Sequence, residues 1–202
     1  MKNSSYFKTH AKECLKGKWG VAILVSIVTV VISSLLNLIP GVGAIVSLLI
    51  SAQLSVGCFI VYTKLVRKEE TKFTDIFENF QYFLTSFAAS MLMSLLIILW
   101  FFLLIIPGII AIYSYSMVFF LKAKNPKMRA YKTVKLSAQI MKGRKWKLFC
   151  LECSFIGWIL FGIITFGIGL FYVIPYMEAT ITAFFEDAYN EYFQLNDNSV
   201  IE

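Results

Sequence analysis

Two glutamates, Glu152 and Glu178, lie well inside apolar runs of the sequence. An acidic side chain at the centre of a membrane costs about 2.5–3.5 kcal/mol on the insertion scale, so each carboxyl needs a partner, water or a proton. Ionisable residues in such positions are typical of ion pathways and proton relays. The chemistry that this pair predicts is a proton or cation relay.

A structural role is the alternative for both glutamates. Counted from the nearest ends of their apolar runs, Glu152 and Glu178 lie roughly 9 and 12 Å deep at 1.5 Å per residue. At that depth Glu152 is expected to reach interfacial water or the neighbouring lysines. Glu178 is expected to bond to Thr180, Thr182 or a tyrosine of another span. The sequence leaves both interpretations open.

Other chemistry finds little support in the residue types. His10 is the sole histidine, which argues against a histidine triad and against a zinc site with paired histidines. Neither a phosphate-binding loop nor a dinucleotide fingerprint occurs. Cys150 and Cys153 have C-x-x-C spacing but follow Trp146 into an apolar run, which favours packing over redox chemistry. We therefore expect no enzyme activity, no cofactor and no metal site.

The elements that must position the glutamates are membrane helices. Apolar residues make up 58% of the 202 residues and charged residues 15%, with a mean hydropathy of +0.73. Globular proteins average about 25% charged residues, so lipid is the expected solvent. The sequence predicts an all-α class, with one membrane domain over residues 1–202. That domain is a polytopic bundle of six transmembrane helices in three hairpins, with interfacial amphipathic helices on the cytoplasmic side.

The six predicted spans are separated by short uncharged breaks and by basic loops. The spans cover about residues 19–39, 42–65, 82–106, 107–121, 146–166 and 170–185. Interfacial helices are expected over about residues 4–17, 73–80 and 126–143. The predicted hinge or turn residues of the breaks are Pro40, Gly41, Pro107, Gly108, Gly167 and Gly169.

The basic residues predict the orientation of the chain. All 19 lysines and arginines lie before Trp19, in residues 64–72 or in residues 122–147. The positive-inside rule then places both termini and both charged loops in the cytoplasm. Because basic residues abut apolar runs, nucleic acid is an unlikely partner and anionic headgroups of the cytoplasmic leaflet are the expected one. The candidate anionic-lipid contacts are Lys127, Arg129, Lys132, Lys135, Lys142, Arg144, Lys145 and Lys147.

Small residues recur at intervals of four in two of the predicted spans. They are Gly43, Ser47, Ser51 and Ser55 in one span, and Ser86, Ser90 and Ser94 in the other. Such stripes let a neighbouring backbone approach closely. They predict helix packing and allow a homo-oligomer or a membrane protein partner.

Internal similarities indicate one unit used three times. Lys16-Gly17-Lys18 corresponds to Lys142-Gly143-Arg144, and Gly41-x-Gly43 corresponds to Gly167-x-Gly169 at the same offset. The predicted repeats cover residues 4–66, 73–122 and 128–185, each with an interfacial helix and two spans.

Several of these residues also resemble a known family. The motifs are Ile106-Pro107-Gly108, Tyr113-Ser114-Tyr115-Ser116-Met117, Ser154-Phe155-Ile156-Gly157-Trp158, Gly167-Ile168-Gly169 and the closing Ala183-Phe184-Phe185. This combination resembles an uncharacterised bacterial integral membrane family catalogued as domain of unknown function nine-seven-five. The resemblance implies a multi-span protein of bacterial plasma membranes and supplies no activity.

The sequence predicts a non-catalytic integral membrane protein of the bacterial plasma membrane, with an accessory, assembly or regulatory role. The alternative is a small transporter or channel that uses Glu152 and Glu178.

Overall fold

The computed structural model describes residues 3–37, 42–165 and 167–198, and these form helices joined by turns, without a strand among them. The α-helices and the two short 3₁₀ helices, labelled η, are α1 (Ser4–Leu15), α2 (Trp19–Asn37), α3 (Val42–Val66), η1 (Phe73–Phe77), η2 (Phe80–Tyr82), α4 (Phe83–Leu103), α5 (Ile105–Tyr115), α6 (Val118–Lys124), α7 (Ala130–Ile140), α8 (Lys145–Cys153), α9 (Ile156–Ile164) and α10 (Leu170–Asn198). The predicted all-α class is confirmed.

Three stretches of the described chain are long and apolar enough to cross a membrane. They are Phe73–Leu103, Ile105–Lys124 and Lys145–Ile164. A fourth is counted if Ser4–Leu15 and Trp19–Leu35, which meet at 100°, form one bent span. The helices thus support a membrane protein with three to four spanning stretches, and the number of six stays a prediction.

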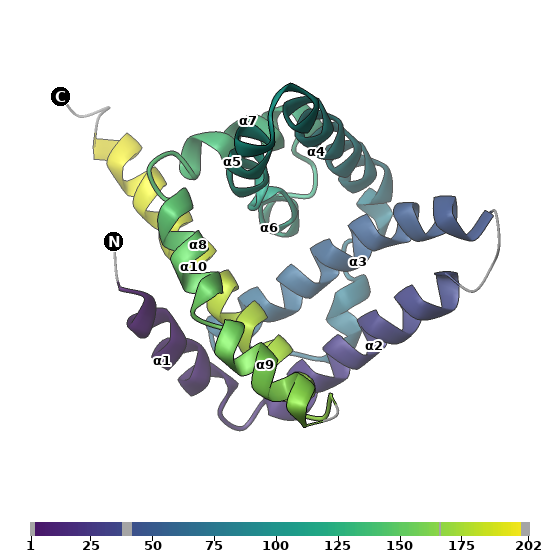
Figure 1. The fold of residues 1–202 in the computed structure, drawn as a ribbon, viewed down its shortest axis with the longest axis vertical. Coiled ribbons are helices and arrows are strands. Elements are labelled where there is room, and N and C mark those ends of the chain that lie inside the picture. The colour runs from purple at the N-terminus through teal and green to yellow at the C-terminus, as the bar shows by residue number, and fades with distance from the viewer. Residues whose placement is uncertain (1–2, 38–41, 166, 199–202) are drawn as a thin grey trace.

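Helices that follow each other in sequence pack as neighbours. Contacts join α2 to α3, α4 to α5 and α9 to α10, and α1 lies along α10 (Figure 1). In this view the connection between α9 and α10 lies at the bottom, while α4 and α5 lie at the top. The pairs therefore diverge from the centre of the molecule instead of forming one parallel bundle.

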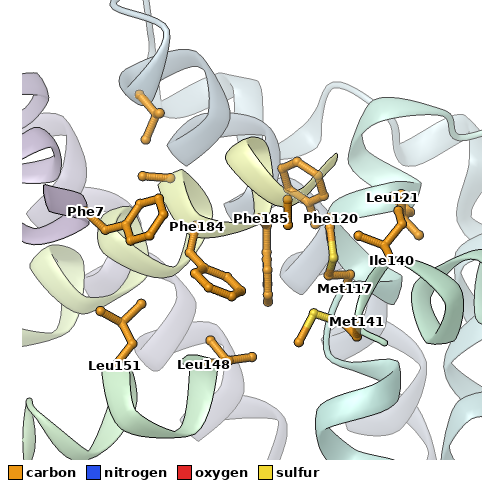
Figure 2. Close-up of a cluster of buried hydrophobic side chains, with 13 residues drawn as sticks. Phe7, Met117, Phe120, Leu121, Ile140, Met141, Leu148, Leu151, Phe184 and Phe185 are labelled. Carbon is orange, nitrogen blue, oxygen red and sulfur yellow. The ribbon is translucent and has the colours of Figure 1, made fainter. Parts of the chain in front are cut away.

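The main hydrophobic core lies where α1, α6, α7, α8 and α10 meet. Phe184 and Phe185 of α10 lie at its centre, with Phe7 on one side and Phe120 on the other (Figure 2). The ring centroids of Phe7 and Phe184 are 5.4 Å apart, and those of Phe120 and Phe185 are 5.8 Å apart. Because Phe7 is buried there, α1 is part of the core instead of only resting on a membrane surface.

Several predicted elements are interrupted in the structure. The expected interfacial helix over residues 73–80 is two 3₁₀ helices, η1 and η2. Asp75 caps η1 by accepting a hydrogen bond from the Lys72 backbone N–H at 3.2 Å, which favours a short tight turn. The fifth predicted span is divided into α8 and α9 at Ser154 and Phe155. The sixth continues as α10 past Phe185 to Asn198, with Pro175 inside the helix.

The predicted turn residues fall into three groups. Pro40 and Gly41 lie outside the described residues. Pro107 and Gly108 lie in the first turn of α5, because the chain breaks earlier, at the extended residue Leu104. A Cβ on Gly108 would lie 2.7 Å from the Phe101 ring, so this glycine serves close packing between α4 and α5 and not a turn.

The last break uses its two glycines in different ways. Gly167 has a φ of 85°, the left-handed conformation that glycine adopts without strain. Gly169 has its backbone N–H bonded to Thr165 Oγ1 at 3.1 Å, and a Cβ there would lie 2.9 Å from the Gly162 Cα. The turn prediction therefore fits Gly167, while Gly169 lets α10 approach α9 closely.

Candidate functional site: a polar cavity with two glutamates

Glu152 lies on α8 and is bonded to a tyrosine of another helix. The Tyr113 hydroxyl of α5 donates to Glu152 Oε2 at 2.8 Å. Neither Lys145 nor Lys147 forms an ion pair with Glu152 in the described part of the chain. The partner of Glu152 is therefore a tyrosine 39 residues away in sequence and not one of the expected lysines.

Glu178 of α10 lines the same cavity as Glu152. The cavity has a volume of about 330 Å³, and its walls come from α2, α3, α8, α10 and the chain around Ser116. Within the described residues no hydroxyl or amide donates to the Glu178 carboxylate, and Thr180 donates instead to the Tyr176 carbonyl at 2.7 Å. The structure thus brings the two sequence-predicted carboxylates to one cavity.

The serine and threonine hydroxyls that line this cavity are available to a ligand only as hydrogen-bond acceptors. Four of them donate their single proton to a backbone carbonyl of their own helix or turn, at 2.8–3.1 Å, which is within the normal range of hydrogen bonds. These are Ser26 to Ala22 at 3.1 Å, Thr29 to Val25 at 2.8 Å, Ser55 to Ser51 at 2.9 Å and Ser116 to Tyr113 at 3.0 Å. A hydroxyl that already donates its proton to a carbonyl can only accept a hydrogen bond from a ligand in the cavity.

In two further contacts of the cavity wall, a serine or threonine hydroxyl accepts a hydrogen bond from another lining residue. Ser26 Oγ lies 3.1 Å from the Tyr62 hydroxyl, and Thr29 Oγ1 lies 3.3 Å from Cys58 Sγ. Because Ser26 and Thr29 already donate to carbonyls, Tyr62 and Cys58 are the donors in these two contacts. Their protons are then also directed into the wall and away from the cavity.

The lining of the cavity therefore favours a positively charged ligand or one that donates hydrogen bonds. It contains two carboxylates and hydroxyl lone pairs, and no lysine, arginine or histidine belongs to the described lining. No group of three or more His, Cys, Asp or Glu residues in the described ranges is arranged to hold a metal ion. The two carboxylates and the hydroxyl lone pairs suit a proton or an organic cation.

Sequence reasoning missed the hydroxyls that line the cavity together with the glutamates. Ser26 and Thr29 are three residues apart in an otherwise apolar helix, which places them on one face and would have been a usable indication. The sequence gives no such indication for Tyr113 and Tyr62, because their roles depend on which helices pack together.

The basic residues of the candidate lipid surface are mostly exposed. Lys127, Arg129, Lys132, Lys135, Lys142 and Lys147 are exposed, whereas Arg144 and Lys145 are partly buried. Arg144 forms an ion pair with Glu191 at 3.1 Å, so it is the member least available to a lipid. In α7 the opposite face is buried through Thr133, Val134, Ser137 and Ile140.

Lys122, at the start of this basic segment, is fully buried. Its ammonium group donates to the carbonyls of Pro126, at 3.3 Å, and Met128. Lys122 therefore stabilises the turn between α6 and α7 and is not available to a membrane surface.

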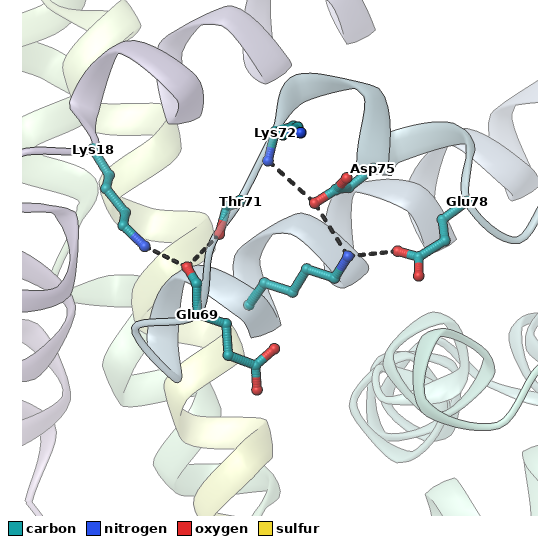
Figure 3. Close-up of polar contacts among 7 residues, drawn as sticks. Lys18, Glu69, Thr71, Lys72, Asp75 and Glu78 are labelled. Carbon is teal, nitrogen blue, oxygen red and sulfur yellow. Dashed lines mark hydrogen bonds and ion pairs between the residues drawn. The ribbon is translucent and has the colours of Figure 1, made fainter.

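A second charged region surrounds residues 64–78. Lys64 pairs with Asp75 at 3.1 Å and with Glu78 at 2.7 Å, and Lys18 donates to the Glu69 carbonyl (Figure 3). These contacts join the end of α3 to η1 and to the start of α2. Most of this charge is therefore neutralised within the protein.

Glu186 of α10 joins two further helices at this side of the molecule. Its Oε1 accepts from Arg67 at 2.6 Å and from Lys124 at 3.0 Å. The hydrogen bond to Glu186 raises the pKa of the Arg67 guanidinium above its ordinary value. The bridge fixes the end of α3 and the end of α6 to α10.

Comparison with known families decides the relationship of the chain. The model of the family described as Protein of unknown function (DUF975) matches residues 1–114 and 101–191, which together span most of the chain. The protein belongs to the DUF975 family. The resemblance found in the sequence motifs is thereby confirmed. No curated protein matches the chain, and no solved structure matches it either.

Both glutamates and the motifs around them lie inside the matched part of this DUF975 protein. The second matched range contains Tyr113, Glu152 and Glu178, and the first contains the α2 and α3 walls of the cavity. The family description names no activity, so any function has to be argued from the cavity itself.

Proposed function

We propose that this protein is a small carrier of the bacterial plasma membrane that binds protons or organic cations in the Glu152–Glu178 cavity. The observation that carries the proposal is the lining of that cavity. Two carboxylates face a space whose serine and threonine hydroxyls donate their protons to backbone carbonyls, so the site offers acceptors to a ligand. Ionisable groups within membrane spans are typical of such pathways.

The proposed membrane arrangement places both termini and the basic loops on the cytoplasmic side. It is supported by the confinement of all 19 lysines and arginines to three segments on one side of the predicted hairpins. Alkaline phosphatase fused after Arg67, Leu104 or Lys142 tests this topology. Activity is expected only for the fusion at Leu104, and activity at Arg67 or Lys142 would reverse or reduce the proposed spans.

Flux measurements in liposomes test the carrier. With the purified protein reconstituted at an inside-negative potential, entry of protons is followed with a trapped pH dye and entry of tetraethylammonium with a radiolabel. We expect flux of at least one of the two to depend on the cavity, and replacement of both glutamates by glutamine (E152Q with E178Q) to abolish it. A Glu70→Gln variant, which changes an exposed loop carboxylate, serves as the matched control.

Each result of that experiment bears on the proposal. Loss of flux in the double variant with normal flux in Glu70→Gln supports the carrier. Equal flux in the wild type, the double variant and empty liposomes overturns it.

A non-catalytic accessory role is the second candidate, and the exposed basic residues favour it. Lys127, Arg129, Lys132 and Lys135 lie on or beside the exposed face of α7, where each is worth about 1 kcal/mol near anionic lipid. In this case the protein holds lipids or partner proteins at the membrane surface without transport. Vesicle binding that does not depend on anionic lipid would leave these residues with a topological role only.

A further inference from the structure

A second hollow of the molecule is an aromatic groove, formed away from the glutamate cavity. It has a volume of about 350 Å³ and lies between α1 and α2 on one side and α9 and α10 on the other. The residues that matter for its chemistry are Lys12, Trp19, Trp158, Phe161, Tyr172 and Tyr176. None of these lines the cavity that contains Glu152 and Glu178.

The aromatic walls are open to the surroundings yet held in place. Trp158 and Tyr172 are 54% and 59% exposed, so a guest can reach them from the side. Trp19 and Tyr172 lie with ring centroids 5.6 Å apart, which joins the start of α2 to α10. The Tyr176 hydroxyl donates to the Lys8 carbonyl at 3.2 Å, which holds α10 against α1. The groove is therefore formed before any guest enters.

Lys12 supplies a positive charge to this otherwise apolar groove. It lies on the exposed face of α1, and in the described ranges its ammonium group has no ion pair or hydrogen bond. Lys8, one turn earlier, is already used, because it donates to the Ser154 carbonyl at 3.1 Å and lies over the Phe155 ring. Lys12 is thus the cation left for a ligand in the groove.

The groove extends along the start of α10. Tyr176 of α10 and Gly169, just before that helix, both line the groove and lie seven positions apart, or roughly 10 Å at 1.5 Å per residue. The α1 helix is amphipathic, with Phe7, Ala11, Cys14 and Leu15 buried, so Lys12 lies on its polar face. A ligand that fits has a negative headgroup at α1 and an apolar chain directed toward the α9–α10 turn.

We propose that this groove is a binding site for an anionic phospholipid, with the phosphate at Lys12 and one acyl chain along Trp158, Phe161 and Tyr172. The charge at one end and the aromatic, laterally open walls favour this occupant over a soluble peptide or a second copy of the chain. The site is independent of the proposed carrier activity, because the two hollows share no lining residue.

The four tryptophans make the groove observable by fluorescence. Two of them, Trp19 and Trp158, line it, while Trp100 lies on α4 and Trp146 on α8. In a Trp100→Phe, Trp146→Phe variant, the remaining emission reports on the groove. The protein is reconstituted in phosphatidylcholine vesicles that contain a small and rising fraction of either brominated phosphatidylglycerol or brominated phosphatidylcholine.

We expect saturable quenching by the anionic brominated lipid at about fivefold lower fraction than by the zwitterionic one, since one lysine is worth about 1 kcal/mol toward anionic lipid. The Lys12→Gln change should remove this preference. The Lys16→Gln change is the matched control, because Lys16 is exposed one turn further along and does not line the groove.

Three outcomes overturn the proposal. Equal quenching by the two lipids would show that the groove has no headgroup preference. A preference that persists in Lys12→Gln but is lost in Lys16→Gln would show that Lys16, and not Lys12, binds the phosphate. Absence of saturable quenching by either lipid assigns the groove to another apolar occupant. The circular dichroism spectrum and elution volume of each variant show whether it has folded, and flux through the glutamate cavity is expected to be unchanged in Lys12→Gln.

Discussion

The main core and the ends of the helix pairs are built from the same apolar residue types but are covered very differently. Phe185 in the core is 2% exposed, whereas Phe102, near the end of α4, is 89% exposed. The neighbouring Leu103, Leu104, Ile105 and Ile106 and, at the other turn, Ile164 and Ile168 are also exposed. Water does not tolerate such continuous apolar surface well. The core is thus held by protein contacts, while the helix ends depend on lipid.

The largest expected difference between the two regions comes from removing one aromatic ring from each. Phe185→Ala is expected to lower the free energy of unfolding by about 3–5 kcal/mol, because it leaves a cavity among packed rings. Phe102→Ala should change it by less than about 0.5 kcal/mol, because its side chain is 89% exposed and packs against little of the protein. Reversible unfolding by dodecyl sulfate in mixed micelles measures both. Similar losses at the two sites would remove the distinction between core and ends.

The ion-pair bridge beside the core gives the next largest effect. Glu186→Gln is expected to cost about 1.5–3 kcal/mol, since Glu186 is only 13% exposed and accepts charged hydrogen bonds from Arg67 and Lys124. The control, Glu78→Gln, removes a pair whose carboxylate is 51% exposed and should cost about 0.5 kcal/mol or less. The same unfolding assay is run at low and high salt. A Glu78 effect as large as that of Glu186 would show that burial does not set the strength of these pairs.

Gly108 lies near the exposed end of the α4–α5 pair but is tightly packed. It is therefore an exception to the contrast between a packed core and exposed helix ends. Gly108→Ala is expected to cost about 1–2 kcal/mol, because the new Cβ would lie 2.7 Å from the Phe101 ring, which must move. Gly157→Ala meets no atom within 4 Å and should be neutral or stabilising by up to about 1 kcal/mol. Thermal unfolding midpoints in detergent compare the two. Equal midpoints would mean that α4 and α5 separate easily at this point.

Two buried serines give the smallest expected effects and test what polar groups contribute near the cores. Ser137 of α7 donates to the Ser114 carbonyl at 2.9 Å, so Ser137→Ala should cost about 1 kcal/mol. Ser86 of α4 is equally buried, and the described part of the chain offers its hydroxyl no partner, so Ser86→Ala should be close to neutral. A large loss at Ser86 would reveal a partner for its hydroxyl in the membrane-embedded protein.

The sequence predicted the parts of this molecule that depend on local pattern. The α-helical class follows from long apolar runs, and the turn at Gly167 follows from a glycine break between two of them. The choice of Glu152 and Glu178 rested on the rarity of charge in such runs, and the structure places both at one cavity. These features need no knowledge of which helices pack together.

The features that the sequence did not predict depend on contacts between distant segments. The bond from Tyr113 to Glu152, the burial of Lys122 under two backbone carbonyls and the bridge at Glu186 all require the helices to be in place. The division of the fifth predicted span into α8 and α9 was missed because the sequence has neither a glycine nor a proline at the break, Ser154 and Phe155. Such a run satisfies the pattern of one helix or of two.

The contact between α1 and α10 has a consequence for biosynthesis. The Tyr176 hydroxyl and the Lys8 carbonyl are 168 residues apart in sequence, and Phe7 and Phe184 are separated by a similar distance. At about 5–20 residues per second, α1 emerges from the ribosome roughly 8–34 s before its partner exists. During that interval the apolar face of α1 has to be sheltered by the bilayer or by insertion factors. The protein closes its core only when the last helix is delivered.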